Sequence, residues 1–307
     1  MADDAKTLPV PGVIARSADR LMDEAMKPKG GYKADFTQPL GEAALAAADS
    51  VSWRVFKNPI SLFIGGITAV LMEFAEPKVR DGVWQNSTFR TDPLGRLKRT
   101  GLAAMVTVYG PRSQAEKMIA GVTRMHGRVR GVTSEGEAYE AMDPVLLDWV
   151  QATASYGFME AYHRFAKPLS DAERDRFYAE AKPAAALYGA VGAPASVAEF
   201  EALSARMAPR FVPSPIATEF LDVMMKVPAL PGIARPLQRM LVRAAVDILP
   251  EPVATVLGLG PRWRLGGIQR RIVGLAARTA NRIVLKASPA VQSCRRMGLA
   301  DDYLYRR

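Results

Sequence analysis

An arginine and a threonine stand four residues apart at the start of an otherwise apolar stretch. They are Arg96 and Thr100, in TDPLGRLKRTGLAAM (residues 91–105). Asp92 followed by Pro93 predicts that a helix begins here, because aspartate caps free N–H groups and proline at the first helical position lacks only a donor that would be free anyway. The spacing of four places the cation and the hydroxyl on one helix face.

This polar face continues along the helix, which we expect to end near Tyr109. Ala103 and Thr107 follow Thr100 at spacings of three and four. Apolar residues surround the rest of the helix: Leu97, Leu102, Met105 and Val108. The polar face is therefore predicted to point inward or to line a cavity.

A buried arginine has to be paired or employed, because an isolated charge is costly to remove from water. One interpretation pairs Arg96 with a core carboxylate, such as Glu73 or Glu76. The other has Arg96 act on a bound group.

A histidine occupies the apolar face of a second predicted helix, in SQAEKMIAGVTRMHGRVRG (residues 113–131). Ser113 with Glu116 matches the S-x-x-E capping box, which predicts a helix start, and Gly131 predicts its end. The histidine, His126, shares a face with residues seven and four positions before it and three after it: Ile119, Val122 and Val129.

A neutral imidazole on an apolar helix face is what haem iron takes as an axial ligand, so His126 is the candidate metal ligand. Arg128 and Arg130 follow closely enough to approach haem propionates. The alternative is a core histidine held by hydrogen bonds.

Other chemistries find little support among the residue types present. The second histidine, His163 in FMEAYHRFAKP, is followed by Arg164 and Lys167, which predict a helix end at the surface. Two histidines and one cysteine, Cys294, are too few for a conventional zinc site or a 2-His-1-carboxylate iron centre unless both histidines converge. The sequence contains no P-loop, nucleophile elbow or dinucleotide-binding motif, and LGLGPRWRLGG lacks a βαβ context.

Helix starts recur along the chain, whereas strand signals are almost absent. Ser170 and Ser196 each begin another S-x-x-E box, and Asp143 precedes a proline as Asp92 does. Apolar residues between these starts recur at spacings of three and four, as in Val145, Leu146, Trp149 and Val150. The sequence therefore predicts an all-α fold with a single large helical domain.

Composition fits a folded protein of the cytoplasm. The chain has 307 residues, is 49% hydrophobic, and carries a formal charge of +10. Acidic residues near the N-terminus differ from the positive start of a signal peptide, and the longest apolar run, residues 59–72, is shorter than a bilayer span of about 20 residues. A single cysteine suits a reducing compartment.

Three regions are predicted: an extended N-terminal arm (residues 1–35), a catalytic body (36–260) and a basic C-terminal helical extension (261–307). The last contains eleven lysines and arginines against two acids. A helical wheel from Ile268 groups the apolar Ile272, Ala276, Ile283 and Val284 opposite most of the basic Arg270, Arg271, Arg278 and Arg282. We expect this helix to dock on the body with its arginines solvated; the alternative is contact with an acidic membrane surface or nucleic acid.

Five sequence blocks in order resemble the MpaB-like oxygenases, which include the latex clearing proteins and many uncharacterised bacterial members. They are GGITAVLMEFAEPKVRDGV, the S-x-F-x-x-D-P-x-x-R-L-x-R-T run from Ser87 to Thr100, RMHGRVRG, DPVLLDWVQATASYGFMEAY and LSDAERDRFYAEAKP. The resemblance covers roughly residues 50–250.

The resemblance implies an all-α fold with a globin-like core that holds haem b and oxidises a small organic substrate with O2. The family's proximal iron ligand falls on His126, and its arginine and threonine fall on Arg96 and Thr100, over the haem. The candidate catalytic residues also include Arg99, which stands where latex-cleaving members have a lysine and which cannot deprotonate to act as a reversible ligand or base. Those members are also exported, whereas no export signal is recognised in this sequence. Rubber cleavage is therefore disfavoured and a soluble intracellular substrate is expected.

The implied partners are the substrate, O2 and an electron donor; no nucleic acid is expected, and residues 261–307 are the candidate for peripheral membrane contact. Two alternatives belong to other classes. One is a carrier or sensor that binds haem or another apolar ligand without turnover, and the other is a peripheral protein that binds membrane or nucleic acid through its basic tail.

Overall fold

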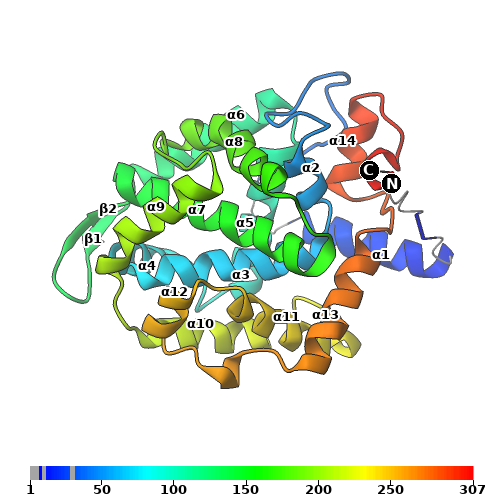
Figure 1. The fold of residues 1–307 in the computed structure, drawn as a ribbon. Coiled ribbons are helices and arrows are strands. Elements are labelled where there is room, and N and C mark those ends of the chain that lie inside the picture. Colours follow the sequence, from blue (N-terminus) through cyan, green and yellow to red (C-terminus); the bar gives the residue numbers. More distant parts are fainter. Residues whose placement is uncertain (1–6, 9–11, 28–31, 307) are drawn as a thin grey trace.

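The central element of the molecule is the helix α3, Pro59–Ala75. The computed structural model describes residues 7–8, 12–27 and 32–306. Asn58 caps α3, since its side chain accepts hydrogen bonds from the N–H groups of Ile60 and Ser61. A helix that is apolar on almost every side belongs in an interior, and α3 accordingly lies across the middle of the molecule (Figure 1).

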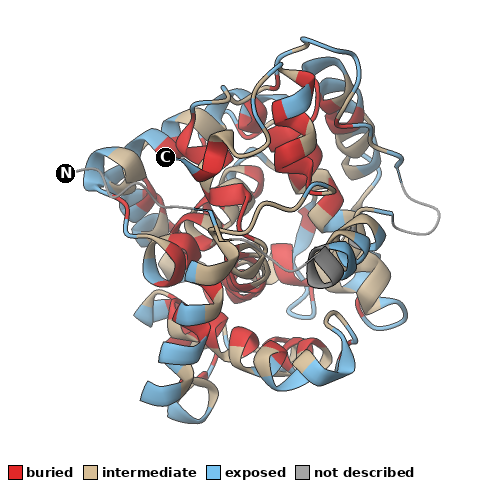
Figure 2. Ribbon diagram, turned by 90° about the vertical axis from the view of Figure 1, so that its right-hand side faces the viewer, coloured by how far each residue is buried: buried red, intermediate tan, exposed pale blue. Residues whose placement is uncertain are grey.

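Two groups of helices enclose α3. Helices α7 and α8 lie on one side and α10, α11 and α12 on the other (Figure 1). The buried residues gather on the inward sides of the helices, and the outer turns are exposed (Figure 2). The α-helices are α1 (Gly12–Ala25), α2 (Val51–Phe56), α3, α4 (Pro77–Asn86), α5 (Pro93–Tyr109), α6 (Arg112–His126), α7 (Pro144–Ala161), α8 (Asp171–Tyr188), α9 (Val197–Met207), α10 (Pro215–Lys226), α11 (Arg235–Asp247), α12 (Glu251–Val256), α13 (Gly267–Ala280) and α14 (Pro289–Arg296).

Helices α3 and α7 meet at a pair of glycines. A Cβ atom added to Gly65 would lie 2.6 Å from the carbonyl oxygen of Gly157, and one added to Gly157 would overlap the Gly65 carbonyl. Real Cβ atoms do not approach backbone so closely, so glycine is required at both positions. This contact fixes the distance between the two helices.

Most predicted helix starts are confirmed, and one is wrong. Asp92 and Asp143 cap α5 and α7, and Ser170 forms the complete capping box of α8. Ser196 caps α9. Ser113 is not a cap, because α6 begins at Arg112 after Pro111 and the Ser113 N–H and hydroxyl both donate to the carboxylate of Glu42.

The predicted end of α6 at Gly131 is also wrong. The helix ends at His126, and Gly131 lies in a short antiparallel hairpin of β1 (Arg130–Val132) and β2 (Ala138–Glu140), where it pairs with Tyr139. A Cβ at Gly131 would overlap the Tyr139 ring. The glycine therefore serves the hairpin, and Val129 is not on the helical face of His126. Within the described residues this hairpin is the only sheet, so the all-α prediction is confirmed.

The N-terminal arm is not extended throughout, because Gly12–Ala25 forms α1. Its residues 1–6, 9–11 and 28–31 lie outside the described part of the chain. Lys98 on α5 donates to the carbonyl oxygen of Glu24 over 3.0 Å, which ties the end of α1 to α5.

The C-terminal extension packs on the body. Lys57 donates to the carbonyl oxygen of Leu304 (2.8 Å), and Asn58 Nδ2 donates to that of Ala277 (2.9 Å). The helical-wheel prediction of which face of α13 packs on the body is wrong. Val273 and Ala277 are buried, whereas Ile272 is exposed. Small residues on the buried side let α13 approach the start of α3.

No single helix in the described ranges is long and apolar enough to cross a membrane. Helices α3 and α4 satisfy the length and composition requirement together, but they are bent by 116° where they meet.

Candidate functional site

The predicted polar stripe on α5 exists, and its two ends have different surroundings. At the far end Thr107 lies 3.0 Å from the Tyr188 hydroxyl of α8. At the near end Arg96 is half-buried and Thr100 is exposed. The stripe is therefore packed against protein at one end, whereas at Thr100 it is exposed, and the predicted inward orientation is wrong there.

Arg96 is held in place by its own helix and by an aromatic ring. Its Nη1 donates to the Thr100 hydroxyl, and that hydroxyl donates to the Arg96 carbonyl oxygen over 2.9 Å. The guanidinium lies 5.2 Å from the centroid of the Phe89 ring, a distance suited to a cation–π contact. These contacts fix the direction in which the cation points.

Glu73, near the end of α3, is the acidic neighbour of Arg96. Burial raises the pKa of Glu73 to about 7, while the Arg96 charge and a hydrogen bond with Thr153 act in the opposite direction. Burial lowers the pKa of Arg96 and the Glu73 carboxylate raises it. The charges of Glu73 and Arg96 interact, but the two side chains form no ion pair within 4 Å. The charge of each group is therefore only partly compensated by the other.

Glu76, the other carboxylate proposed as a partner of Arg96, has a different role. It is buried, and it caps α4 by accepting from the Val79 N–H over 2.8 Å. Its second oxygen accepts from Arg210 Nη2 over 2.6 Å. Glu76 therefore holds the α3–α4 junction together, and Glu73 is the carboxylate of the candidate site.

His126 ends α6 and lies within electrostatic range of Arg96. Burial lowers the pKa of His126, and the Arg96 charge lowers it further. Both effects favour the neutral form of the imidazole. None of the described residues hydrogen-bonds to either ring nitrogen, so the structure leaves an available lone pair beside the polar end of α5.

Thr123, one turn before His126, is a polar neighbour of the candidate site that the sequence did not predict. Its hydroxyl oxygen is buried and makes no hydrogen bond within the part of the chain that the structure describes. A threonine at i−3 from a histidine carries no distinctive signal, so only the structure could identify it. Phe89 was also missed, although it stands in the S-x-F-x-x-D-P run.

The remaining arginines of the predicted site form no hydrogen bond with the His126 ring within the described residues. Arg99 donates to the Thr88 hydroxyl (2.6 Å) and pairs with Asp92 (3.2 Å), so it secures the start of α5. Arg128 is exposed after the end of α6. Arg130 is exposed in β1, 3.9 Å from Glu140 of the facing strand.

His163 accepts a hydrogen bond from a backbone N–H group. It lies in the π-helical turn Tyr162–Ala166 that continues α7, and its Nδ1 accepts a hydrogen bond from the Leu169 N–H over 3.0 Å. The two histidines of the chain therefore differ, since His163 has a structural partner and His126 has none among the described residues.

The chain matches the family model described as "ER-bound oxygenase mpaB/B'/Rubber oxygenase, catalytic domain" over residues 53–281. The match covers most of the chain and includes Glu73, Arg96, Thr100 and His126. The chain belongs to this family. The model describes an oxygenase catalytic domain, and residues 53–281 of this chain correspond to it.

Two mycobacterial proteins, one from Mycobacterium bovis and one from Mycobacterium tuberculosis, are each 31% identical to this chain over 117 residues. Both are described as uncharacterised. The matched segment is 37% of this chain and 46% of each relative, so the chain spans about half the length of the curated relatives it matches. No solved structure matches, and the globin-like arrangement of the core stays a prediction.

Proposed function

We propose that the chain is a haem b-dependent oxygenase that uses O2 and an electron donor to oxidise a small organic substrate. In this proposal His126 binds the haem iron, and Arg96 and Thr100 contact the haem or the bound substrate from α5. Membership of the oxygenase family supports the class of reaction.

The observation that carries the proposal is the state of His126. Iron binds the lone pair of a neutral imidazole, and burial together with Arg96 favours that neutral form. No described residue uses the ring nitrogens for hydrogen bonding. A histidine kept for structure would normally have such a partner, as His163 has. The donor chemistry of the site therefore fits haem iron.

The polar groups of α3 and α5 are suited to handle charge and protons beside such a ligand. Arg96 can donate hydrogen bonds to an anionic oxygen, and its orientation is fixed by Phe89 and Thr100. Glu73, with a pKa raised to about 7, can hold or release a proton on its carboxyl oxygen near neutral pH. When bound, haem would supply the redox chemistry with O2.

A haem titration followed by visible absorption tests the proposal. We expect apoprotein to bind one equivalent of haem with a Soret band, and His126→Ala to lose most of this binding. His163→Gln is the matched control, because glutamine can still accept from the Leu169 N–H. A Soret spectrum that is the same in His126→Ala and wild type would refute the assignment.

A second measurement separates an oxygenase from a haem carrier. Reduced holoprotein is supplied with an electron donor and candidate substrates, and O2 uptake is recorded with product analysis. Uptake coupled to oxygen insertion supports the proposal, whereas stable binding with no turnover across substrate classes favours the carrier.

A further inference from the structure

Helix α13 presents an apolar stripe to solvent. Ile268, Ile272 and Leu275 are spaced by four and three residues, and their exposed fractions are 77%, 43% and 63%. The opposite side of the helix is buried through Val273 and Ala277. The stripe is therefore a second apolar face, which the fold of this chain leaves uncovered.

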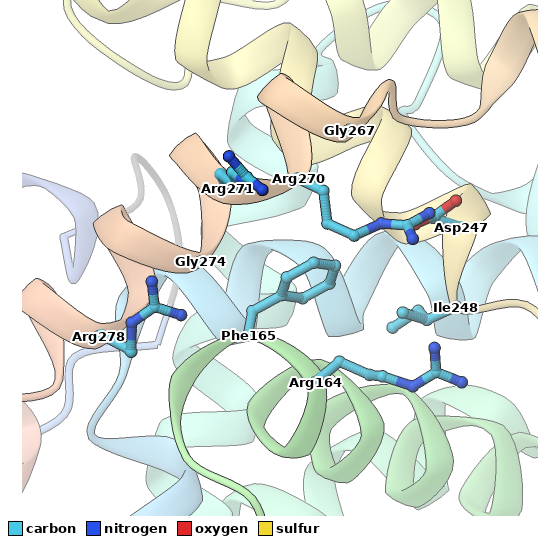
Figure 3. Close-up of a pocket in the computed structure, with 9 residues that line it drawn as sticks. All are labelled: Arg164, Phe165, Asp247, Ile248, Gly267, Arg270, Arg271, Gly274 and Arg278. Carbon is cyan, nitrogen blue, oxygen red and sulfur yellow. The ribbon is translucent and has the colours of Figure 1, made fainter.

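One flank of the stripe carries arginines without acidic partners. Arg271 and Arg278 are exposed, and neither has an ion pair or hydrogen bond with any described residue. They line a cleft of about 340 Å³ between α13, the π-helical turn and the end of α11 (Figure 3), together with Arg164, Phe165, Asp247 and Arg270.

The other cations of this cleft are already engaged. Arg270 reaches Asp247 at 2.7 Å, as Figure 3 shows, and Arg164 pairs with Glu160 at 2.7 Å. Gly274 lies between the arginines, and a Cβ there would be 2.8 Å from Arg278 Nη1. The absence of a side chain at Gly274 gives the Arg278 guanidinium room at the cleft.

Arginines also line the other flank. A second cleft, of about 260 Å³, separates α13 from α11 and is lined by Arg239, Arg243 and Gln269. Neither arginine has an acidic partner within the described ranges. The exposed aliphatic stripe thus lies between two clefts that both carry positive charge.

This part of the chain holds most of the net charge. Residues 235–282 contain nine arginines, no lysine and two acids. Both acids are neutralised locally, since Asp247 pairs with Arg270 and Glu251 pairs with Arg264 at 2.8 Å. The positive field around the stripe is therefore not balanced by neighbouring carboxylates.

We propose that α13 docks on the surface of an anionic phospholipid bilayer, with Ile268, Ile272 and Leu275 at the headgroup–acyl boundary and Arg271 and Arg278 pairing with lipid phosphates. An aliphatic stripe flanked by arginines matches the layering of such a surface, where phosphates lie directly above hydrocarbon. Nucleic acid would complement the arginines but not three exposed aliphatic side chains. With 14 residues, α13 lies on the membrane and does not span it.

Vesicle flotation tests this proposal with the full-length protein. We expect binding to phosphatidylcholine vesicles that contain one third phosphatidylglycerol, and at least tenfold weaker binding to pure phosphatidylcholine. Raising the salt from about 0.1 to 0.5 M should weaken the binding, because screening acts on exposed charges. Absence of binding to the anionic vesicles at low salt would overturn the proposal.

Two double variants separate the apolar and basic contributions. Ile272→Ser with Leu275→Ser, and Arg271→Glu with Arg278→Glu, should each reduce binding at least tenfold. Val191→Ser and Arg206→Glu, on exposed residues elsewhere, serve as matched controls.

Circular dichroism establishes that each variant is folded. If only the arginine variant lost binding, and the wild type bound a duplex oligonucleotide or soluble glycerol phosphate as tightly as vesicles, the surface would be an anion site and the membrane proposal would be wrong.

Discussion

Two arginines of this molecule, Arg296 in α14 and Arg96 in α5, are surrounded by protein in different ways. Arg296 is 1% exposed and donates to the carbonyl oxygens of Phe36, Glu42 and Tyr109 at 2.8–2.9 Å. Arg96 is half-buried, and its hydrogen bond goes to the exposed Thr100. Burial lowers the pKa of both guanidiniums.

The histidines repeat this contrast. His163 accepts from a backbone N–H, and His126 has no hydrogen-bonding partner among the described residues. Where hydrogen bonds are complete, a polar side chain joins segments that are distant in sequence. Where they are incomplete, at Arg96 and His126, the proposed function assigns the missing partners to a ligand. The following predictions test that difference.

The largest effect on stability is expected for Arg296→Met. This change keeps an unbranched side chain but removes the Arg296 hydrogen bonds to three carbonyl oxygens, of which only that of Tyr109 keeps another donor among the described residues, Ser293. The free energy of unfolding should therefore fall by about 3–5 kcal/mol. Urea denaturation followed by circular dichroism measures it. A loss below about 1 kcal/mol would mean that the hydrogen bonds of Arg296 are not structural.

Glu73→Gln should change how stability depends on pH. The native pKa of Glu73 is about 7, above its unfolded value, so the native state binds the extra proton and stability falls as the pH rises from about 4.5 to 7. The glutamine variant should lack this loss, and above pH 7 it should be more stable than wild type by roughly 3 kcal/mol.

Urea midpoints at pH 5 and pH 8 give the comparison. The pKa of His126 is lowered, which acts in the opposite direction, so only the difference between wild type and variant isolates Glu73. The exposed Glu219→Gln is the control. Equal pH dependence in wild type and Glu73→Gln would contradict the raised pKa.

Arg96→Met should separate activity from stability. The change removes a half-buried cation with one helical partner, so the unfolding free energy should shift by no more than about 1 kcal/mol. Without the Arg96 charge, the pKa of His126 should rise, which an NMR titration can follow. Once a substrate is known, turnover should fall about 100-fold or more. A variant as unstable as Arg296→Met would place Arg96 in the structural class.

The smallest effect is expected for Arg99→Lys, which introduces the lysine that the resemblance to latex-cleaving proteins leads one to expect at this position. Arg99 contacts Asp92 and Thr88 at a partly exposed position, so its loss should cost about 0.5 kcal/mol or less. Thermal unfolding measures the change. Haem binding should also be preserved, and a strong loss of it would place Arg99 at the haem site.

The sequence predicted the helical class and most helix starts because caps are local signals. Asp92, Asp143 and Ser170 interact with N–H groups only a few residues away. The predicted helix cap at Ser113 failed because Ser113 hydrogen-bonds to Glu42, 71 residues earlier in the chain. The prediction that Gly131 ends α6 also failed because of a tertiary contact. Glycine is required there by the Tyr139 ring of the facing strand, and the hairpin has no alternating β-branched pattern in the sequence.

The candidate site was predictable in part. Spacing placed Arg96 and Thr100 on one face and separated His126 from His163. Choosing Glu73 over Glu76 required the structure, because the two carboxylates are three residues apart and only Arg210, 134 residues after Glu76, distinguishes them. The docking face of α13 depended equally on distant contacts, here with Asn58.

The most direct test of the central claim is chemical rescue of the His126 imidazole. His126→Gly is titrated with haem in the absence and presence of free imidazole, and the Soret band and the iron–nitrogen vibration are recorded. If His126 binds the iron, the variant should lose the histidine-ligated spectrum and imidazole should restore it. A wild-type spectrum from His126→Gly without imidazole, or a wild-type protein that binds no haem while fully folded, would contradict the account.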